Sequence, residues 1–281
     1  RDTLWWLEFR RVLFRSVYRD LDLGTGKVVR DKGDKKDFWS EGVLHYGIDI
    51  LDVSNQYNIS DFQKYCNSKL KAIWRKGKLP IICGGSPLYV ISVLEGWQFP
   101  KTKPDLKLRA ELENLSTNEL YQKLLKVDRV RAKNIDSKNK RRLVRALEIV
   151  MNDTKINPLV KKPLKADTIV LGIKKDREEI KKLIGQRLEK RINNGMVDEV
   201  KKLKEKGISP KRLDDLGLEY RYINLYLEGK LSLKAMKEQL YNKINQFAKR
   251  QMTWFKKFEN VLWIDNDFKL AQNIINNLWK I

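Results

Sequence analysis

The sequence predicts an α/β protein built around a parallel β-sheet, and three observations support this fold class. The apolar run at 48–53 has the length of a buried strand, and a helical pattern follows it at 60–77. A second short apolar run covers 79–83, and the turn at 84–86 then opens another helix. Strands that alternate with helices in this order pair in parallel, with the helices as crossover connections.

Local signals justify the elements in turn. Ser60 is a good N-cap, and the apolar positions after it step by three and four until Gly77 ends the first helix. After Asp176 a long helix carries a stripe of Ile and Leu and ends near Gly195. The remaining elements are expected as strands at 168–173 and 261–264 and as helices at 197–206 and 232–258.

Composition changes along the chain predict its domain organisation. Residues 100–165 are charged and helix-favouring and have prolines near both ends, which predicts a helical insertion. Residues 17–99 and 166–281 together form the α/β core with its C-terminal helices. Residues 1–16 continue neither pattern and are treated as an atypical N-terminal segment.

The chain is strongly basic, which indicates an anionic partner. It has 59 Lys and Arg against 36 Asp and Glu in 281 residues, a formal charge of +23, and most of the excess follows residue 100. A field of this sign suits a polyanion, with nucleic acid ahead of an anionic membrane. The alternative is that the many lysines only form solvated helix faces.

Composition also excludes several kinds of site. Cys66 and Cys83 are the only cysteines and His45 is the only histidine, so neither a disulfide framework nor a Cys/His zinc site can be assembled. Any metal would have oxygen ligands. No apolar run approaches the roughly 18 residues that cross a bilayer, and no secretory signal pattern is present. We therefore expect a cytoplasmic protein that does not act at a membrane.

A phosphate-binding P-loop is the first motif to test in an α/β core. It requires Gly-x-x-x-x-Gly-Lys followed by Ser or Thr, so that amides, the lysine and a hydroxyl converge on a pyrophosphate. The Gly-Lys pairs at 26–27, 77–78 and 229–230 are followed by Val or Leu, so none qualifies. Ligands of parallel sheets bind at the carboxyl ends of the strands, where Asp49 and the 84–86 turn are expected.

Two basic segments have the composition of nucleic-acid contacts. In 139–148, three arginines on neighbouring helical positions suit successive phosphates or a splayed base, and the alternative is a solvated helix face on which Glu148 pairs with Arg145. In 248–257, cations alternate with amide and aromatic groups, a mixture that binds single-stranded RNA. The alternative there is a core pair of aromatic residues flanked by surface lysines.

Five motifs occur in order along nearly the whole chain. They are VYRDLDLGTGK at 17–27, HYGIDILD at 45–52, GGSPLY at 84–89, RRLVRALE at 141–148 and KRQMTWF at 249–255. Together they resemble the signatures of the tRNA dimethylallyltransferase (tRNA isopentenyltransferase) family. The resemblance implies a P-loop NTPase-like parallel sheet core, here lacking its first strand and P-loop, with a helical insertion domain.

The resemblance also implies a reaction. Enzymes of this family transfer a dimethylallyl group from dimethylallyl pyrophosphate to N6 of the adenosine 3′ of the tRNA anticodon, with Mg²⁺. The implied partners are the tRNA anticodon stem-loop and dimethylallyl pyrophosphate, and a monomer is expected. Such a reaction needs a flipped-out base, a clamp on the departing pyrophosphate and a proton acceptor near N6.

Matching positions assign roles by this resemblance. Ser86 stands where the family has Thr and keeps a hydroxyl near the reacting groups, and Arg187 matches the family arginine expected at the pyrophosphate. Asp49 is a candidate to organise Mg²⁺ through water, with a plain helix-cap or strand-end carboxylate as the alternative. The family often has Gln where Arg141 stands, a departure that bears on a base contact. The implied tRNA contacts are Arg109, Arg141, Arg142, Arg145, Arg250, Gln251 and Trp254.

Residues 1–16 depart from the family pattern. Aligning Val17 with the family's Val-Tyr places Leu13 at the expected general-base Asp, and Phe14 and Ser16 at the following Ser and Gln. The family P-loop has no counterpart in this segment. Its letters LEFRRVLFRS resemble a translated sequencing adapter, so we expect a truncated reading frame with an artefactual head. The alternatives are a genuine amphipathic segment and a diverged enzyme that works without the loop.

These departures keep a second function open. Loss of the base and of the pyrophosphate clamp is expected to cost orders of magnitude in rate, so the alternative is a non-catalytic basic RNA-binding module derived from the same fold. A nucleotide kinase is a weaker third hypothesis, because no Walker lysine is present. A missing first strand would leave backbone groups unpaired, so we also expect the chain to be aggregation-prone or loosely packed in its first 50 residues.

Overall fold

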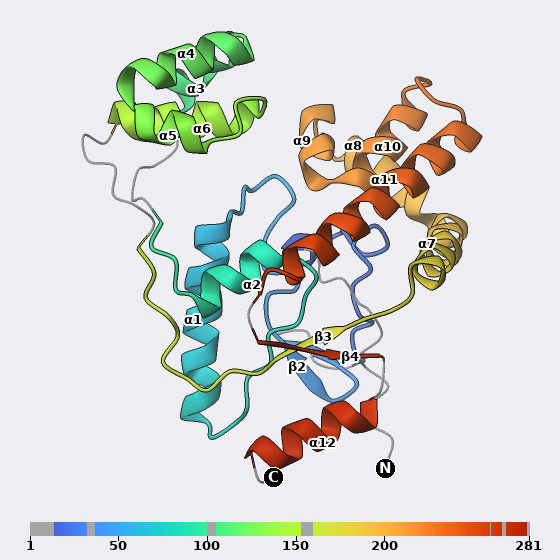
Figure 1. Ribbon diagram of the computed structural model, residues 1–281. Helices are drawn as coiled ribbons and strands as arrows, with labels where there is room; N and C mark the ends of the chain where they lie inside the picture. The colour runs from blue at the N-terminus through green and yellow to red at the C-terminus, as the bar shows by residue number, and fades with distance from the viewer. Residues whose placement is uncertain are drawn as a thin grey trace. The chain divides into compact units, whose positions relative to one another are not determined.

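The structure, a computed structural model, describes residues 14–32, 37–99, 105–152, 160–258, 260–265 and 268–279. The chain forms two compact units. Unit 1 comprises Arg1–Leu94 and Lys165–Ile281, and unit 2 comprises Glu95–Leu164. In Figure 1, unit 2 is a group of short helices, whereas unit 1 carries the longer helices and the strands.

Unit 2 is built from helices in its described part. These are α3 (Leu106–Glu113), α4 (Thr117–Val127), α5 (Arg129–Asn134) and α6 (Lys140–Asn152). A capping box starts α4: the Ser116 side chain accepts from the Glu119 amide, and the Glu119 carboxylate accepts from the Ser116 amide. Leucines of α4 and α6 form the core, so the apolar positions of the 139–148 segment face inward.

Unit 1 contains the remaining helices. A π-helical segment, Ile192–Met196, joins two of them and contains Gly195 with φ 95°, a value that favours glycine. No helix among the residues the structure describes has the length and apolar character to span a membrane. The helices are α1 (Ile59–Arg75), α2 (Pro87–Leu94), α7 (Arg177–Arg191), α8 (Val197–Glu205), α9 (Pro210–Leu216), α10 (Leu218–Leu227), α11 (Leu233–Phe255) and α12 (Phe268–Trp279).

The N-terminus of α1 differs by two residues from the prediction. The cap is Asn58 rather than Ser60: the Asn58 side chain accepts from the amides of Ser60 and Asp61, and the Asp61 carboxylate accepts from the Asn58 amide. Asn caps as well as Ser, and Asp61 completes a capping box with Asn58. The sequence pattern located the helix but not its first residue.

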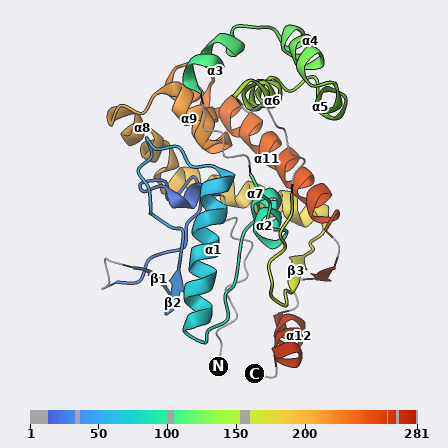
Figure 2. The same ribbon diagram turned by 90° about the vertical axis from the view of Figure 1, so that its left-hand side faces the viewer.

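Among the residues that the structure describes, two small sheets stand in place of the single parallel sheet that was expected. The strands β1 (Phe38–Ser40) and β2 (Val43–His45) pair antiparallel beside α1 in Figure 2. The strands β3 (Val170–Ile173) and β4 (Val261–Ile264) pair in parallel. This second pair joins the segments predicted as strands at 168–173 and 261–264, and it gives unit 1 its α/β character.

The predicted strand at 79–83 is wrong for the structure, and the one at 48–53 is reduced to a short pairing. Leu51 makes an isolated parallel bridge with Tyr18, with backbone hydrogen bonds between 16–19 and 49–51, whereas 79–83 has no strand assignment. Ile81 in the second segment is 80% exposed. A strand requires ladder hydrogen bonds from a neighbour, and Pro80 has no amide to donate. An apolar run without such a neighbour stays irregular.

The main core of unit 1 lies among α7 to α11 and includes the start of the described chain. Val17, Tyr18 and Leu21 are buried in the same cluster as Leu188 and Tyr220. Fully burying a side chain of this size contributes about 1.5–3 kcal/mol. The expectation of loose packing is therefore wrong for this stretch, because its apolar side chains have a helical surface to bury against.

Candidate active site and nucleic-acid interface

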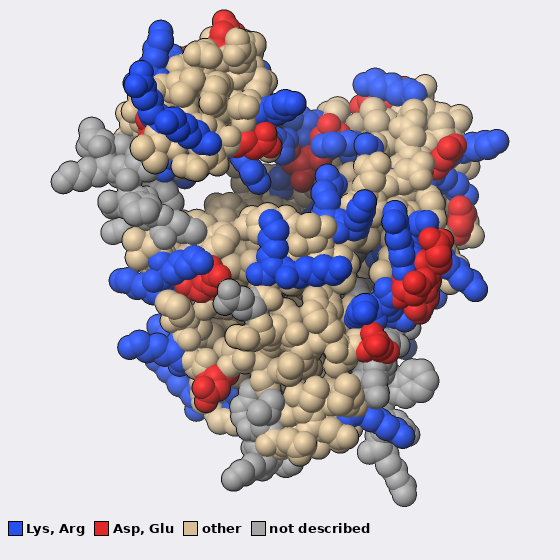
Figure 3. All heavy atoms as spheres, viewed as in Figure 1, with Lys and Arg blue, Asp and Glu red and all other residues tan. Residues whose placement is uncertain are grey.

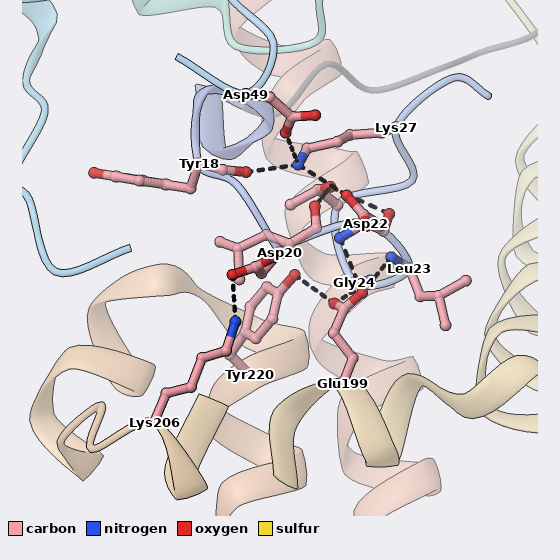
Figure 4. Close-up of polar contacts among 12 residues, drawn as sticks. Tyr18, Asp20, Asp22, Leu23, Gly24, Lys27, Asp49, Glu199, Lys206 and Tyr220 are labelled. Atoms are coloured by element: carbon pink, nitrogen blue, oxygen red, sulfur yellow. Dashed lines mark hydrogen bonds and ion pairs between the residues drawn. The ribbon is translucent and has the colours of Figure 1, made fainter. Parts of the chain in front are cut away.

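A tight loop in unit 1 is held by one carboxylate, as Figure 4 shows. Glu199 on α8 accepts hydrogen bonds from the amides of Asp22 (2.9 Å), Leu23 (2.6 Å) and Gly24 (3.1 Å). The Tyr220 hydroxyl on α10 donates to the same carboxylate at 2.9 Å, and burial raises the pKa of Tyr220. We call these contacts the loop clamp. They fix the 22–24 backbone onto two helices.

Lys27 closes the same loop from inside. Its side chain is 3% exposed, and its ammonium donates to the Tyr18 carbonyl at 2.6 Å, to the Asp22 carboxylate at 2.9 Å and to the Asp49 carboxylate. An ammonium has three donors, and these three acceptors occupy them. Lys27 is therefore an internal tie of the loop, consistent with the failure of its segment to match a P-loop.

Asp49, the candidate for organising Mg²⁺, has Lys27 as its partner in this structure. Its backbone is left-handed, with φ 55°, which is typical of a turn residue. Over the described ranges, no group of three or more His, Cys, Asp or Glu side chains is placed to hold a metal ion. Mg²⁺ commonly keeps several waters and binds through one or two carboxylates together with substrate phosphates.

Two arginines lie one turn apart on α7, and Arg191 contacts the loop. Arg191 donates to the Gly24 carbonyl at 3.3 Å and lies 3.9 Å from the Glu219 carboxylate, which Arg15 also contacts at 3.2 Å. Arg187 is half-buried and has no hydrogen bond or ion pair with any residue that the structure describes. Within the described residues, Arg191 is thus held by hydrogen bonds and ion pairs and Arg187 is not.

The electrostatics of Arg187 agree with that placement. Burial, with a smaller contribution from the charge of Arg191, lowers the pKa of Arg187 to about 10, while Glu219 opposes the shift. The guanidinium stays protonated at neutral pH, and removing it from water raises the strength of any ion pair it forms. A planar fork of this kind suits a pyrophosphate, which it can bind in bidentate fashion.

Ser86 lies in a turn that α11 contacts. The Gln251 side chain on α11 donates to the Gly85 carbonyl, and the Ser86 carbonyl accepts from the Tyr89 amide at 3.1 Å as α2 begins. No hydrogen bond of the Ser86 hydroxyl is present within the described part of the chain. The fold therefore brings together the 84–86 and 249–255 motifs, which are far apart in sequence.

The aromatic end of the 249–255 motif lies at the surface. Trp254 is 41% exposed, with the Lys257 ammonium 5.5 Å from its ring centre, and Arg250 is exposed. The alternative of a buried aromatic pair is wrong for Trp254. Phe255 is half-buried and packs against Phe258 at 5.5 Å between ring centres. An exposed indole beside cations is suited to stacking on a base.

Two of the four predicted tRNA contacts of unit 2, Arg109 and Arg145, contact one acid. Glu148 on α6 is fully buried, and it accepts from Nε and Nη2 of Arg109 at 2.8 and 2.9 Å and from Nη1 of Arg145. Arg141 and Arg142 are exposed on the same helix. Lys and Arg side chains are prominent on the edge of unit 2 in Figure 3. The pairing of Arg145 with Glu148, posed as an alternative to RNA binding, is present and includes Arg109 as well.

Sequence reasoning missed three residues of these arrangements. Arg191 was detectable, because it follows Arg187 by four residues and so lies on the same helix face. Glu199 and Tyr220 gave no signal. A carboxylate that binds distant backbone amides has the same sequence appearance as a solvated one.

Unit 1 with its α/β elements and unit 2 with its surface arginines belong to a strongly basic chain of net charge +23. The IPP transferase family model matches residues 16–258, and the chain belongs to this family. It is 39% identical over 258 residues to tRNA dimethylallyltransferase 1 of Azobacteroides pseudotrichonymphae, covering 89% of this chain and 82% of the relative. It is 34% identical to tRNA dimethylallyltransferase of Anoxybacillus flavithermus, with 94% and 84% covered.

Solved structures agree with this family. The tRNA isopentenylpyrophosphate transferase of Bacillus halodurans matches with a TM-score of 0.66 and 30% identity, covering 94% of this chain and 84% of the other. A eukaryotic dimethylallyltransferase acting on tRNA matches with a TM-score of 0.75 and 23% identity, covering 95% and 71%, and supports the fold. The family named by the sequence motifs is confirmed.

Proposed function

We propose that the protein prenylates tRNA, transferring a dimethylallyl group from dimethylallyl pyrophosphate to N6 of the adenosine 3′ of the anticodon. The observation that carries this proposal is the family match over residues 16–258, with relatives named tRNA dimethylallyltransferase. In the reaction, the bond from the allylic carbon to pyrophosphate oxygen breaks, a bond from that carbon to N6 forms, and N6 loses a proton. Pyrophosphate leaves with the electron pair.

Arg187 has the properties that the leaving group requires. Negative charge grows on the pyrophosphate as the bond breaks, and a fixed guanidinium stabilises that charge more than it stabilises the intact substrate. Ser86 would present its hydroxyl to the reacting groups from the turn before α2. Mg²⁺, when bound, would neutralise pyrophosphate charge and would be held largely by pyrophosphate oxygens and water, since the described side chains offer no cage.

The RNA would be held by both units. In unit 1 the proposed contacts are Arg250, Gln251 and Trp254, of which Trp254 is exposed for stacking. In unit 2 they are Arg109, Arg141, Arg142 and Arg145. The helical segment 100–165 is then the tRNA-binding insertion of a P-loop NTPase-like core, and the enzyme works as a cytoplasmic monomer.

The residue that accepts the proton from N6 is not assigned in this chain. The resemblance places Leu13 where the family has its general-base Asp, and Leu13 lies outside the described residues. We therefore compare the chain as written with a graft in which a family-like strand, P-loop and Asp-containing stretch precede Val17. The assay incubates each with dimethylallyl pyrophosphate, Mg²⁺ and an anticodon stem-loop, and follows the RNA by mass spectrometry.

The graft is expected to add one dimethylallyl group to the adenosine, and the chain as written to be slower by orders of magnitude. In the graft, Arg187→Gln should lower the rate by about 10²–10³, whereas Arg177→Gln, at an exposed position of the same helix, should leave it unchanged. No transfer by either protein, with salt-sensitive RNA binding by both, would support the non-catalytic RNA-binding module instead.

A further inference from the structure

Glu148 is the only fully buried carboxylate in the part of unit 2 that the structure describes, and the proposed reaction does not use it. Its side chain is 0% exposed, whereas those of Arg109 and Arg145 are 30% and 36% exposed. A buried carboxylate is costly unless it is paired and hydrogen-bonded. Its partners here are two of the residues that we propose to contact tRNA.

The contacts of Glu148 fix both a helix and an arginine. One oxygen, Oε1, accepts from the Asp105 amide at 2.7 Å and from Arg109 Nε at 2.8 Å. Asp105 is the N-cap of α3, where its side chain accepts from the Leu108 amide at 3.0 Å. The carboxylate therefore sets the start of α3 and the orientation of the arginine one turn into that helix.

The geometry leaves part of the Arg109 guanidinium available. Arginine has five N–H donors, and Glu148 takes one on Nε and one on Nη2. The donors on Nη1 have no partner among the residues that are described, and the side chain is partly exposed. A guanidinium held at one edge and open at the other can bind a phosphate with no loss of side-chain freedom at that moment.

The shared contact argues against a purely structural role. Two partly exposed guanidinium groups bind one buried carboxylate. A buried ion pair is weak evidence for stability, since apolar residues of the same volume often stabilise a core as well. The observed arrangement instead restricts two cations while keeping part of each side chain exposed to solvent.

Resting on the proposed function, we propose that Glu148 is a positioning residue that orients Arg109 and Arg145 for the phosphates of the tRNA anticodon stem-loop. Orientation matters for a folded RNA, whose phosphates have fixed spacings, and matters little for a flexible strand that adapts to any basic surface. Glu148 thus contributes to the discrimination between folded and unfolded RNA rather than to the overall attraction.

The test measures the affinity of the full chain for two RNAs, an anticodon stem-loop and a single-stranded homopolymer of equal length, at one salt concentration. Glu148→Gln removes the carboxylate with little change of shape. Glu111→Gln on α3 is the matched control, because Glu111 is exposed and the change adds the same unit of net charge. Fluorescence anisotropy gives both affinities, and circular dichroism confirms that each variant is folded.

Glu148→Gln is expected to weaken stem-loop binding on the order of tenfold while homopolymer binding changes by less than about twofold. Glu111→Gln should leave both unchanged. Equal stem-loop affinity in the two variants would overturn the positioning role. A wild-type chain that binds both RNAs equally would overturn the proposed substrate, and the inference with it.

A second variant keeps the inference open to disproof if Glu148→Gln does not fold. Arg109→Lys retains the charge, but a lysine cannot reproduce the two-donor contact with one carboxylate. It should show the same selective loss of stem-loop affinity. Stem-loop selectivity equal to that of the wild-type chain in Arg109→Lys would contradict the proposal.

Discussion

Two carboxylates, one in each unit, anchor their surroundings in different ways. Glu199 in unit 1 binds three backbone amides and a tyrosine hydroxyl, whereas Glu148 in unit 2 binds two arginines and one amide. The donors that bind Glu199 are occupied by this contact. The two arginines that bind Glu148 have side chains that are 30% and 36% exposed.

The difference teaches how to separate structural from functional acids. A carboxylate that satisfies amides fixes a fold, and its loss should appear as instability. A carboxylate that satisfies partly exposed arginines fixes a surface, and its loss should appear in what that surface binds. The predictions below test this distinction from the largest expected effect to the smallest.

The largest effect on stability is expected at the loop clamp. Glu199→Gln replaces charge-assisted hydrogen bonds to three amides and puts an amide donor among donors, so the free energy of unfolding should fall by about 2–4 kcal/mol. Asp198→Asn, at the exposed neighbouring position, is the control. Urea unfolding measures both. A loss below that of the control would show that the clamp contributes nothing.

The next largest loss of stability is expected when Lys27 is replaced. Lys27→Met removes an ammonium that is 3% exposed and leaves the Asp49 carboxylate without its partner, which should cost about 2–3 kcal/mol in unfolding free energy. Lys71→Met, at an exposed position of α1, should cost less than about 0.5 kcal/mol. Similar stabilities for the two variants would mean that Lys27 is not an internal tie.

The acid dependence of stability should single out Glu148. Burial by itself would raise the pKa of Glu148, but hydrogen bonds from Arg109, Arg145 and the Asp105 amide outweigh it, so the pKa is lower than usual. Such a group stabilises the fold fully above its unfolded pKa, near 4.3, and the stabilisation is lost as the pH falls through the lower folded value. Each unit of depression is worth about 1.4 kcal/mol.

The matching measurement is unfolding of the wild-type chain and Glu148→Gln between about pH 6 and pH 2.5. The wild-type chain should lose more stability than the variant in the range below pH about 4.3. Parallel curves for the two proteins would contradict the charged state assigned to this carboxylate.

The smallest predicted effect is the difference in stability between the alanine variants of two glycines. Gly26 has φ +66° and Gly42 has φ +71°, but a Cβ at Gly26 would lie 1.8 Å from Arg191 Nη2, whereas one at Gly42 would meet nothing within 4 Å. Both Ala variants carry the backbone penalty of about 1 kcal/mol, and Gly26→Ala should cost about 1 kcal/mol more. Equal thermal midpoints would show that Arg191 moves aside freely.

Periodic elements could be predicted from the sequence, and long-range contacts could not. The pattern of Ile and Leu after Asp176 located α7, on which Ile184 and Leu188 are buried. The Glu199 contact with Leu23 joins residues 176 apart and leaves no period in either segment. Arg145 pairs with Glu148 three residues away and was foreseen, whereas Arg109 lies 39 residues away and was not.

The strands show the same limit. The runs at 168–173 and 261–264 became strands because they pair with each other, whereas 48–53 makes only one parallel bridge, to Tyr18, and 79–83 has no strand assignment. Pairing is decided by the rest of the chain. The family motifs identified the family although the local signals did not place every strand, because a family signature reflects a whole fold rather than one segment.

The most direct measurement compares Glu148→Gln and Glu199→Gln for anticodon stem-loop affinity under conditions where both are folded. The account predicts that Glu148→Gln binds the stem-loop about tenfold more weakly than the wild-type chain, and that Glu199→Gln, although less stable, binds it with wild-type affinity. Equal losses of affinity, or a loss confined to Glu199→Gln, would contradict the division between an acid that holds the fold and an acid that holds the RNA-binding arginines.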